Sequence, residues 1–481
     1  MAVASQGCRL VPYSCRHPES TILYRIVQQH LETYLALAWE DDSDGYSVPA
    51  HVEREFRQYL ECAILAYGFA RARCGECGHD FLVAFSWKGR AVCPSCNTRR
   101  MVETAAHLVD HVLPPLPVRQ WVLSLPKRLR YYLQHDRKAL NTALRIFLDE
   151  IERHLRAHSP GAGPDARAGA VAFIHRFGSS LNPHTHFHVC VIDGVFASDP
   201  EGGVQFIAGD ELDVDDAEAV QGRVRRRILG AFARCGILDK DERKEMQLWN
   251  HGGGFSLDAT VRIAADDRRG LERLLRYCAR PPFPSGRLEE LDAHRLIYHL
   301  PKPGPDGRAQ LLLSPLEPIE RIAALVPPPR QHRHRYFGVL APNAPLRAAV
   351  TALVPEAVTA QSTPPVKSSS GEQPTETPQR SPARYLWAML LARIYEVFPL
   401  TCMRCGAEMR IVAFITEATP VQRILSHIGE SAAPPRIAPA RGPPSWEEDD
   451  SEAIFLDEAR FPGDPLAQPE PDYEFDQRLT W

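Results

Sequence analysis

Apolar residues recur along the chain with two periods, the 3.6-residue period of an amphipathic helix and the two-residue period of a strand. The first period predicts helices over residues 21–39, 52–70, 98–112 and 138–158, and a further helix that begins at Asp266. The second predicts strands over residues 118–125, 170–177, 184–196, 204–208, 255–264 and 295–300. Strands grouped with intervening helices predict an α+β fold with a largely antiparallel sheet flanked by helices.

Two shifts in composition indicate where this fold ends. Residues 354–384 are rich in Pro, Ser and Thr, and residues 429–481 are rich in Pro and acidic residues. Segments with so few large apolar side chains cannot repay the entropy of ordering by burial. We therefore predict five regions, namely a helical region with a cysteine ribbon over 1–113, the main α+β domain over 114–345, a disordered linker over 354–384, a small C-terminal module over 385–425 and an acidic Pro-rich tail over 429–481.

The overall composition, 44% hydrophobic and 24% charged residues in 481, is that of a globular protein. No apolar run is long enough to span a membrane and the first residues lack the pattern of a signal peptide, so we expect a cytoplasmic protein with no membrane partner. The formal net charge of −4 hides twelve acids and two arginines between residues 445 and 481, which leaves +6 on the rest. A basic body with an acidic tail is typical of a nucleic-acid-binding protein, although a solvated tail without a binding role has the same pattern.

Two C-x-x-C pairs, Cys74 with Cys77 and Cys93 with Cys96, are separated by fifteen residues. In a reducing compartment such pairs are more often metal ligands than disulfides. The intervening segment has the pattern of a short hairpin, which predicts that the four thiolates close one tetrahedral, structural Zn²⁺ site. Basic residues of this ribbon are candidate DNA contacts, with a purely structural ribbon as the alternative; they are Lys88, Arg90, Arg99 and Arg100.

Another C-x-x-C motif, Cys402 with Cys405, lies in the predicted C-terminal module. No partner pair follows it, so a closed metal site there would need ligands from elsewhere in the chain or from another chain. The other six cysteines, Cys62 among them, have no ligand spacing and are expected to be buried or incidental thiols.

Three histidines, His184, His186 and His188, alternate along one predicted strand and therefore share one face. His186 and His188 bracket an apolar residue, an arrangement that presents two nitrogen ligands to one metal. If strand 170–177 turns and pairs antiparallel with this strand, His175 lies opposite His186 and becomes the candidate third ligand. The alternative to metal binding is that these histidines only form hydrogen bonds, and this alternative applies above all to His175 and His184.

The helix that begins near Asp266 is strongly amphipathic. Its buried stripe consists of Leu271, Leu274, Leu275 and Cys278. At 100° per residue, Tyr277 falls at the edge of the buried face, and Arg273 and Arg280 fall on the same flank. A phenol flanked by guanidiniums suits a phosphodiester, although a tyrosine at such an edge is usually structural.

Taken together, the histidine strand, the tyrosine helix and the cysteine ribbon resemble the HUH superfamily of single-strand DNA endonucleases. More closely, residues 60 to about 345 resemble the transposases of the insertion-sequence ninety-one group. The segments that carry this resemblance are CGEC…CPSC, QWVLSLPKRLRYYL, AVAFIHRFGSSLNPHTHFHVCVIDGVF, LLRYCARPPF, PLEPIERIAALVPPPRQHRHRYFGVLAPNA and YLWAMLLARIYEVFPLTCMRCGAEMRIVAFI. The resemblance implies that the domain over 114–345 is an HUH-type nuclease core.

The resemblance further implies that His186 and His188 hold a divalent metal, Mg²⁺ or Mn²⁺, and that Tyr277 attacks a DNA phosphate. The product would be a 5′-phosphotyrosine, formed on single-stranded, hairpin-bearing element ends during rolling-circle-like transposition. Two-tyrosine relatives carry a second tyrosine four residues later, and here that position is Pro281, so the chain resembles a single-tyrosine member. Tyr298 is the fallback nucleophile.

Two further segments mix basic and aromatic residues, the combination that holds single strands of DNA. Their candidate DNA contacts, for which a solvated face is the alternative, are Lys127, Arg128, Arg130, Tyr131 and Tyr132 in one segment and Arg333 and Arg335 in the other. The sequence contains no P-loop motif, so we expect no nucleotide cofactor. Three other functions compete, namely a rolling-circle replication initiator or relaxase, a non-catalytic zinc-ribbon DNA-binding protein, and a metallohydrolase built on His184, His186 and His188.

Overall fold

The computed structural model describes residues 16–40, 48–87, 89–199, 203–283, 285–304, 307–354, 402, 404–407 and 409–441. Residues 355–384 of the predicted linker, residues 442–481 of the predicted tail and Lys88 lie outside the described residues. None of the helices in this described part of the chain is both long and apolar enough to cross a membrane.

The main sheet is antiparallel and has six strands in the order β13-β4-β5-β3-β8, with β9 beside β8 along the same edge of β3. Its strands are β3 (Val118–Ser124), β4 (Gly169–Phe177), β5 (Pro183–Ile192), β8 (Ser256–Asp258), β9 (Arg262–Ile263) and β13 (His334–Gly338). The predicted α+β class with a largely antiparallel sheet is therefore confirmed.

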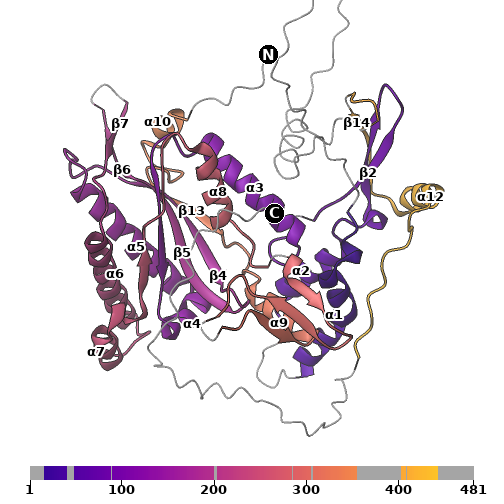
Figure 1. The fold of residues 1–481 in the computed structure, drawn as a ribbon, viewed down its shortest axis with the longest axis horizontal. Helices are drawn as coiled ribbons and strands as arrows, with labels where there is room; N and C mark the ends of the chain where they lie inside the picture. Colours follow the sequence, from indigo (N-terminus) through magenta and orange to yellow (C-terminus); the bar gives the residue numbers. More distant parts are fainter. Residues whose placement is uncertain are drawn as a thin grey trace, which may run out of the picture.

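Helices cover both faces of this sheet (Figure 1). One face packs on α4 (Lys127–His135), α5 (Arg137–Ala157), α6 (Val214–Arg234) and α7 (Lys240–Leu248), and the other on α3 (Pro94–His111), α8 (Arg268–Cys278) and α10 (Arg347–Ala352). The two-residue period of β5 produces this division, because Phe187 and Val189 join the first core while Cys190 joins the second. His186 and His188 thereby point to the face that carries α8.

A separate hydrophobic core forms around the N-terminal helices. It is built from α1 (Ile22–Glu40), α2 (Ala50–Glu61), α9 (Leu316–Leu325) and a three-stranded sheet of β10 (Leu288–Glu290), β11 (Leu296–His299) and β12 (Gln310–Leu313). Residues from 283 to 326 therefore pack with the N-terminal helices, although the predicted boundaries placed them in the main domain. The order of the elements along the chain does not indicate this packing, because the segment follows α8 directly.

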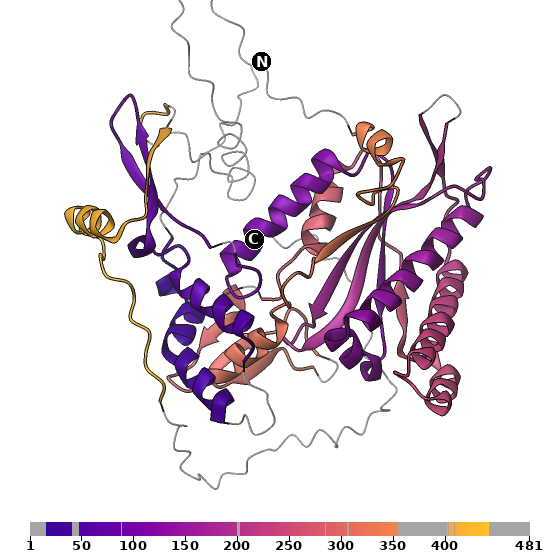
Figure 2. The ribbon, with the colours of Figure 1, turned by 180° about the vertical axis from the view of Figure 1, so that it is seen from behind.

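The C-terminal segment is not a separate module either. β14 (Met409–Ile415) pairs antiparallel with β1 (Phe69–Cys74), which also pairs with β2 (Asp80–Ala84), and α12 (Ala418–Ile428) packs on Phe69. Beyond α12 the chain passes along α1, where Ala438 N donates to Gln28 O at 3.0 Å, as the view from behind shows (Figure 2). Of the region predicted over 385–425, residues 385–401 lie outside the described residues, and Met409–Ile415 completes a sheet that begins in the N-terminal region.

Most predicted helices and strands are present, with shorter bounds where the backbone turns. The predicted strand over 184–196 is β5 followed, after Asp193, by β6 (Gly194–Ser198), which forms a hairpin with β7 (Val204–Ala208). The predicted helix over 52–70 is α2 alone, because Ala63 and Gly68 adopt positive φ angles of 64° and 113° and β1 follows. The remaining short 3-10 segments are Pro18–Ser20, Leu65–Tyr67, His251–Gly254 and Ser285–Arg287.

Candidate active site and thiolate clusters

The pairing of β4 with β5 brings three histidines together. His175 is the register partner of His186, as the sequence predicted, and His188 follows two residues later on the same face. One ligand nitrogen from each of the three lies within 4.8 Å of the other two. The three side chains are 2 to 8% exposed, so the cluster is enclosed by the sheet and α8.

Each imidazole is oriented by one ring nitrogen and leaves the other nitrogen toward the cluster. His175 Nε2 lies 2.6 Å from Cys278 O, His186 Nδ1 lies 3.0 Å from His184 O, and His188 Nδ1 lies 2.8 Å from the Gln120 amide. Among the described residues, His175 Nδ1 and His188 Nε2 are buried without a hydrogen-bond partner. Buried, unpartnered imidazole nitrogens that face one another fit a bound cation.

The electrostatics of the cluster suit metal binding as well. Burial lowers the pKa of His175 and His188 well below the usual value and that of His186 to about 4. Arg280 acts in the same direction on all three pKa values. The imidazoles are therefore neutral at pH 7, which is the form that donates a lone pair to a metal.

His184 does not join this cluster. Its Nε2 lies 3.4 Å from the Ser124 hydroxyl, and its side chain is half-buried at the start of β5. Of the two candidate third ligands, the described structure places His175 and not His184 with His186 and His188. The triad of a metallohydrolase built on His184 is therefore not formed.

The α8 helix carries Tyr277 to the edge of the histidine cluster. Asp267 caps the helix by accepting from Gly270 N at 2.7 Å. The Tyr277 ring meets His188 edge-on with centroids 5.6 Å apart, and the Arg280 guanidinium lies 4.4 Å from the centroid of the Tyr277 ring. Arg273 is exposed one turn before Tyr277. The tyrosine is half-buried, between a candidate metal site and a cation.

Tyr298, the fallback nucleophile, lies elsewhere. Its side chain is 1% exposed in the core around the N-terminal helices and stacks on Phe283 with ring centroids 6.1 Å apart. Burial also raises the pKa of its phenol. A phenol enclosed in this way cannot reach a DNA phosphate, and the fallback assignment is wrong.

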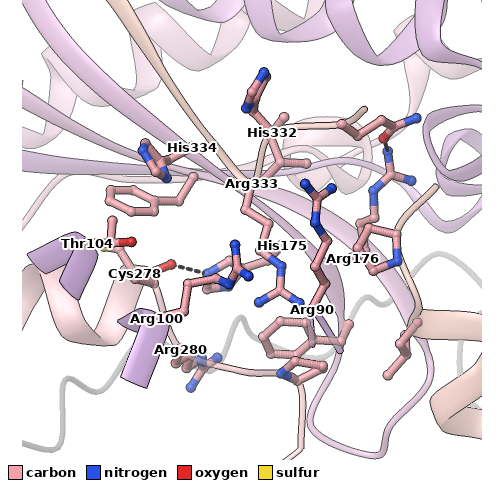
Figure 3. A pocket seen from close by; sticks show the side chains of 18 residues that line it. Arg90, Arg100, Thr104, His175, Arg176, Cys278, Arg280, His332, Arg333 and His334 are labelled. Atoms are coloured by element: carbon pink, nitrogen blue, oxygen red, sulfur yellow. Dashed lines mark hydrogen bonds between the residues drawn. The ribbon is translucent and has the colours of Figure 1, made fainter. Parts of the chain in front are cut away.

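A basic cavity of about 160 Å³ adjoins the histidine cluster (Figure 3). His175, Cys278 and Arg280 line it together with Arg333, one of the candidate DNA contacts. Arg335, the neighbouring candidate, instead donates to Asn141 Oδ1 at 2.7 Å.

The candidate DNA contacts of the first basic segment lie on α4. Arg128 forms an ion pair with Glu242, and Arg130 Nε donates to Leu125 O at 2.9 Å. Tyr132 packs against the core, whereas the neighbouring Tyr131 is 66% exposed. Lys127 opens the helix. The helix packs on β5, the strand that carries His184 and His186. The Arg130 charge accordingly lowers the pKa of both histidines.

The predicted single zinc site of Cys74, Cys77, Cys93 and Cys96 is not formed. Cys74 ends β1 and Cys77 lies in the turn to β2, so this pair sits at the tip of the hairpin. The five residues of β2 then carry the chain back by about 17 Å before the second pair is reached. The expected hairpin is real, but its turn holds the first pair instead of bringing the two pairs together.

Cys74 and Cys77 instead meet the C-terminal motif. Their Sγ atoms lie 3.5 Å from that of Cys405 and 3.4 Å from that of Cys402, respectively. Thiolates bound tetrahedrally to zinc at 2.3 Å lie about 3.8 Å apart. A disulfide would need about 2 Å. Four thiolates at these separations fit a closed, structural Zn²⁺ site whose ligands come from both ends of the chain.

Cys93 and Cys96 form a second cluster with Cys62, which follows α2. The Cys62 Sγ lies 3.4 Å from Cys96 Sγ and 3.7 Å from Cys93 Sγ, and the Ser86 hydroxyl lies 3.2 Å from Cys96 Sγ. These separations again suit thiolates around zinc. We had expected Cys62 to be a buried or incidental thiol. It is buried, but its position beside Cys93 and Cys96 makes it a candidate ligand as well.

Sequence reasoning missed several contributors to these sites. Gln120 is a buried polar residue between Val118 and Val122 on one face of β3, and a polar side chain between two valines on that face was the available signal. The carbonyl of Cys278 was not a readable candidate, because any residue can supply it. Cys62 stands alone in sequence, without the C-x-x-C spacing that marks ligands.

Comparison with known proteins agrees with this architecture. One family model, described as a transposase zinc-binding domain, matches residues 26–125, and a second, described as a putative transposase, matches residues 169–347. A transposase for insertion sequence element IS801 from Pseudomonas savastanoi pv. phaseolicola is 24% identical over 375 residues, which cover 75% of this chain and 83% of that protein. No solved structure matches the chain. The histidine cluster and Tyr277 lie in the second matched region, and Cys402 and Cys405 lie beyond both.

Proposed function

The chain belongs to the insertion-sequence ninety-one (IS91) family of transposases, and from this membership we propose that it cuts and rejoins single-stranded DNA through a covalent tyrosine intermediate. The proposed site is the HUH-type arrangement of a histidine pair on a strand and a tyrosine on a helix. Its proposed substrate is single-stranded DNA at the ends of the element, folded into hairpins.

One observation carries this proposal, namely the position of Tyr277 between His188 and Arg280. The edge-on contact with His188 brings the phenol to the candidate metal site, and the Arg280 guanidinium lies over the ring. This cation–π contact holds the ring in place beside the candidate metal site. The same guanidinium can also contact the phosphate and so orient it for attack.

In the proposed step, the Tyr277 oxygen forms a bond to phosphorus while the bond between phosphorus and the 3′-oxygen breaks. The phenol loses its proton, and the departing 3′-oxygen takes one up and leaves as a hydroxyl. The 5′-phosphate stays on the tyrosine as a diester, so the bond energy is kept for rejoining. Attack by a 3′-hydroxyl on this diester reverses the chemistry and returns Tyr277 to its phenol.

His175, His186 and His188 would hold the divalent metal of this reaction. Such an ion polarises the scissile phosphate and offsets the charge that develops on it. The donors within the described cluster are all imidazoles. Mg²⁺ takes oxygen ligands almost throughout, so imidazole donors favour Mn²⁺ of the two ions considered.

Mapping of the covalent adduct tests the proposal. The full-length chain is incubated with Mn²⁺ and single-stranded oligonucleotides that bear candidate terminal hairpins, and adducts are separated on a denaturing gel and digested. We expect the nucleotide on the peptide that contains Tyr277. Tyr277→Phe keeps the ring and its packing, so it should eliminate both nicking and adduct while the fold and zinc content stay unchanged.

Tyr298→Phe is the matched control, because it removes a phenol oxygen from a tyrosine that is buried in the other core. It should cleave as wild type does. An adduct on any other residue, or full cleavage by Tyr277→Phe, would contradict the proposed nucleophile.

A further inference from the structure

Apart from His175 and Arg280, the residues that line the basic cavity beside the histidine cluster have no role in the chemistry described so far. We propose that this cavity binds a second backbone phosphate of the DNA strand that is cut at Tyr277, a proposal that rests on the function proposed above. We call the cavity the arginine pocket, after the five arginines that line it, Arg90, Arg100, Arg176, Arg280 and Arg333.

The pocket is assembled from distant parts of the chain. Arg90 precedes α3 and Arg100 lies on it, Arg280 follows α8, and Arg333 precedes β13. Arg90, Arg100 and Arg280 lie around His175, so the pocket begins where the histidine cluster ends (Figure 3). A strand bound at Tyr277 would therefore reach the pocket without leaving the protein surface.

No acidic side chain occurs among the described residues that line the pocket. The acidic group that acts on Arg333 from nearby is Glu55, whose Oε2 already accepts from Arg90 N at 2.7 Å. Burial and the charges of Arg100 and Arg90 lower the pKa of Arg333 to about 10. Cations that repel one another in a partly dry site are stabilised by an anion that enters between them.

Hydrogen-bond donors remain available to such an anion. Among the described residues, Arg280 Nε is buried without a hydrogen-bond partner. The bond from Arg333 Nη1 to Asn97 Oδ1 is long at 3.4 Å, whereas Arg176 is held by Gln134 O at 2.9 Å and by Gln331. Arg176 is therefore held in one position, whereas Arg280 and Arg333 can turn toward a ligand. Forked guanidinium donors match the paired oxygens of a phosphodiester.

The second thiolate cluster holds the start of α3, next to Arg90 and in the helix that carries Arg100. Cys93 caps that helix by accepting from Cys96 N, and Asn97 Nδ2 donates to Ala91 O at 2.6 Å. Both contacts fix the turn between Arg90 and α3. The zinc-binding region would thus contribute to DNA binding through the pocket rather than through an exposed face of its own.

Binding of single-stranded DNA by cleavage-incompetent protein tests this proposal independently of the nucleophile. The full-length Tyr277→Phe chain, without added Mg²⁺ or Mn²⁺ and without a chelator that would remove structural zinc, is titrated with one single-stranded oligonucleotide at several salt concentrations. Arg333→Ala and Arg90→Ala should each weaken binding several-fold and reduce the slope of log K against log salt by about 0.7, the value for one phosphate of a single strand. Arg90 is exposed, so its variant keeps the test valid if Arg333→Ala fails to fold.

Arg276→Ala is the control, since Arg276 lies on α8, forms an ion pair with Glu272 and does not line the pocket. It should leave the salt slope unchanged. Oligonucleotides with one uncharged methylphosphonate linkage locate the contact. At one position this linkage should weaken binding by the parent protein and leave binding by Arg333→Ala unchanged.

Two results would overturn the proposal. One is an unchanged salt slope in both pocket variants, together with the same loss of affinity at every methylphosphonate position in the parent protein and in the variants. The other is thermal stabilisation of the parent by inorganic phosphate, absent in Arg333→Ala, without any sensitive linkage, which would indicate a free-anion site. Loss of the covalent adduct in the earlier experiment affects neither readout, so the two proposals fail separately.

Discussion

His175 lies directly opposite His186 across the antiparallel pair of β4 and β5, with ring centroids 5.0 Å apart. His188 follows on the same face, and its ring centroid lies 4.3 Å from that of His175. The candidate metal site therefore draws on both strands. A metal bound here would lie on the rigid centre of the sheet, where the ligands keep their positions as substrate binds and leaves.

Replacement of the ligand histidines should separate cleavage from DNA binding. His186→Ala or His188→Ala removes a nitrogen donor, so we expect cleavage to be abolished while single-stranded DNA still binds through phosphate contacts. His175→Ala should raise the Mn²⁺ concentration needed for half-maximal cleavage. Gel assays of nicking over a metal titration, with parallel binding measurements, check each variant.

His184→Ala is the control for these variants, because His184 lies next to the cluster but outside it. It should shift the metal titration far less than His175→Ala. If His184→Ala and His175→Ala exchanged these behaviours, His184 would be the third ligand and the assignment drawn from the register would be wrong.

Zinc analysis should distinguish the observed thiolate clusters from a single ribbon site. We expect two zinc ions per chain, because each cluster places thiolates at separations that suit the ion. Cys402→Ser should lose one of them and Cys62→Ser the other, since each variant breaks a different shell. Metal content is measured on the purified full-length chain.

A single ribbon site predicts a different zinc content for these two variants. A ribbon site made by Cys74, Cys77, Cys93 and Cys96 would hold one zinc ion, and neither Cys402→Ser nor Cys62→Ser would change its amount. That result would contradict the thiolate clusters that the structure shows.

The histidine cluster was accessible to sequence reasoning because its determinants are local. A two-residue period fixes the face of His186 and His188, and a short turn between two adjacent strands fixes which residue lies opposite. Tyr277 was placed at a helix edge by the 3.6-residue period of α8 in the same way. Each inference needs only a window of about 15 residues.

The thiolate clusters were beyond such reasoning because their determinants are not local. Cys74 and Cys405 are neighbours across 331 positions of the chain, and pairing of β1 with β14 brings them together. Nothing near Cys62 marks it as a ligand. The burial of Tyr298 likewise depends on packing against the N-terminal helices, which a pattern in its own strand does not report.

A buried ion pair near the end of β5 should be important for stability. Asp193 accepts from Arg119 Nε and Nη2 at 3.1 and 3.0 Å and from Arg262 Nε at 2.7 Å. Asp193→Ala would leave the Arg119 charge buried without its partner, which costs about 3–5 kcal/mol in unfolding free energy. Urea denaturation followed by circular dichroism measures the change.

Glu289→Ala provides the comparison for an exposed pair. Glu289 contacts His299 at 2.8 Å, but its side chain is 61% exposed, so its removal should cost no more than about 1 kcal/mol. A loss for Asp193→Ala as small as this would show that the buried pair does not stabilise the sheet.

Gln120 should tune metal binding without touching the metal. Its amide nitrogen Nε2 lies 2.8 Å from His188 Nδ1 and 3.3 Å from Cys278 Sγ. A 180° turn of the amide exchanges this nitrogen for the oxygen within the same space. If His188 Nε2 binds the ion, Nδ1 carries the proton, and the amide must present its oxygen as an acceptor. Gln120→Leu keeps the bulk but removes the acceptor, so we expect a 10- to 100-fold higher Mn²⁺ concentration for half-maximal cleavage, a typical loss for such an outer partner.

Gln120→Glu separates this role from simple packing. A carboxylate can only accept, so it should keep His188 in the same tautomer and maintain or strengthen metal binding, with little change in the maximal rate at saturating Mn²⁺. If Gln120→Glu raised the Mn²⁺ concentration for half-maximal cleavage as much as Gln120→Leu does, Gln120 would have to donate to His188 Nδ1. The proton would then be on Nε2 of His188, a nitrogen that could not bind the ion, and the metal site would have to be built from His175 and His186 alone.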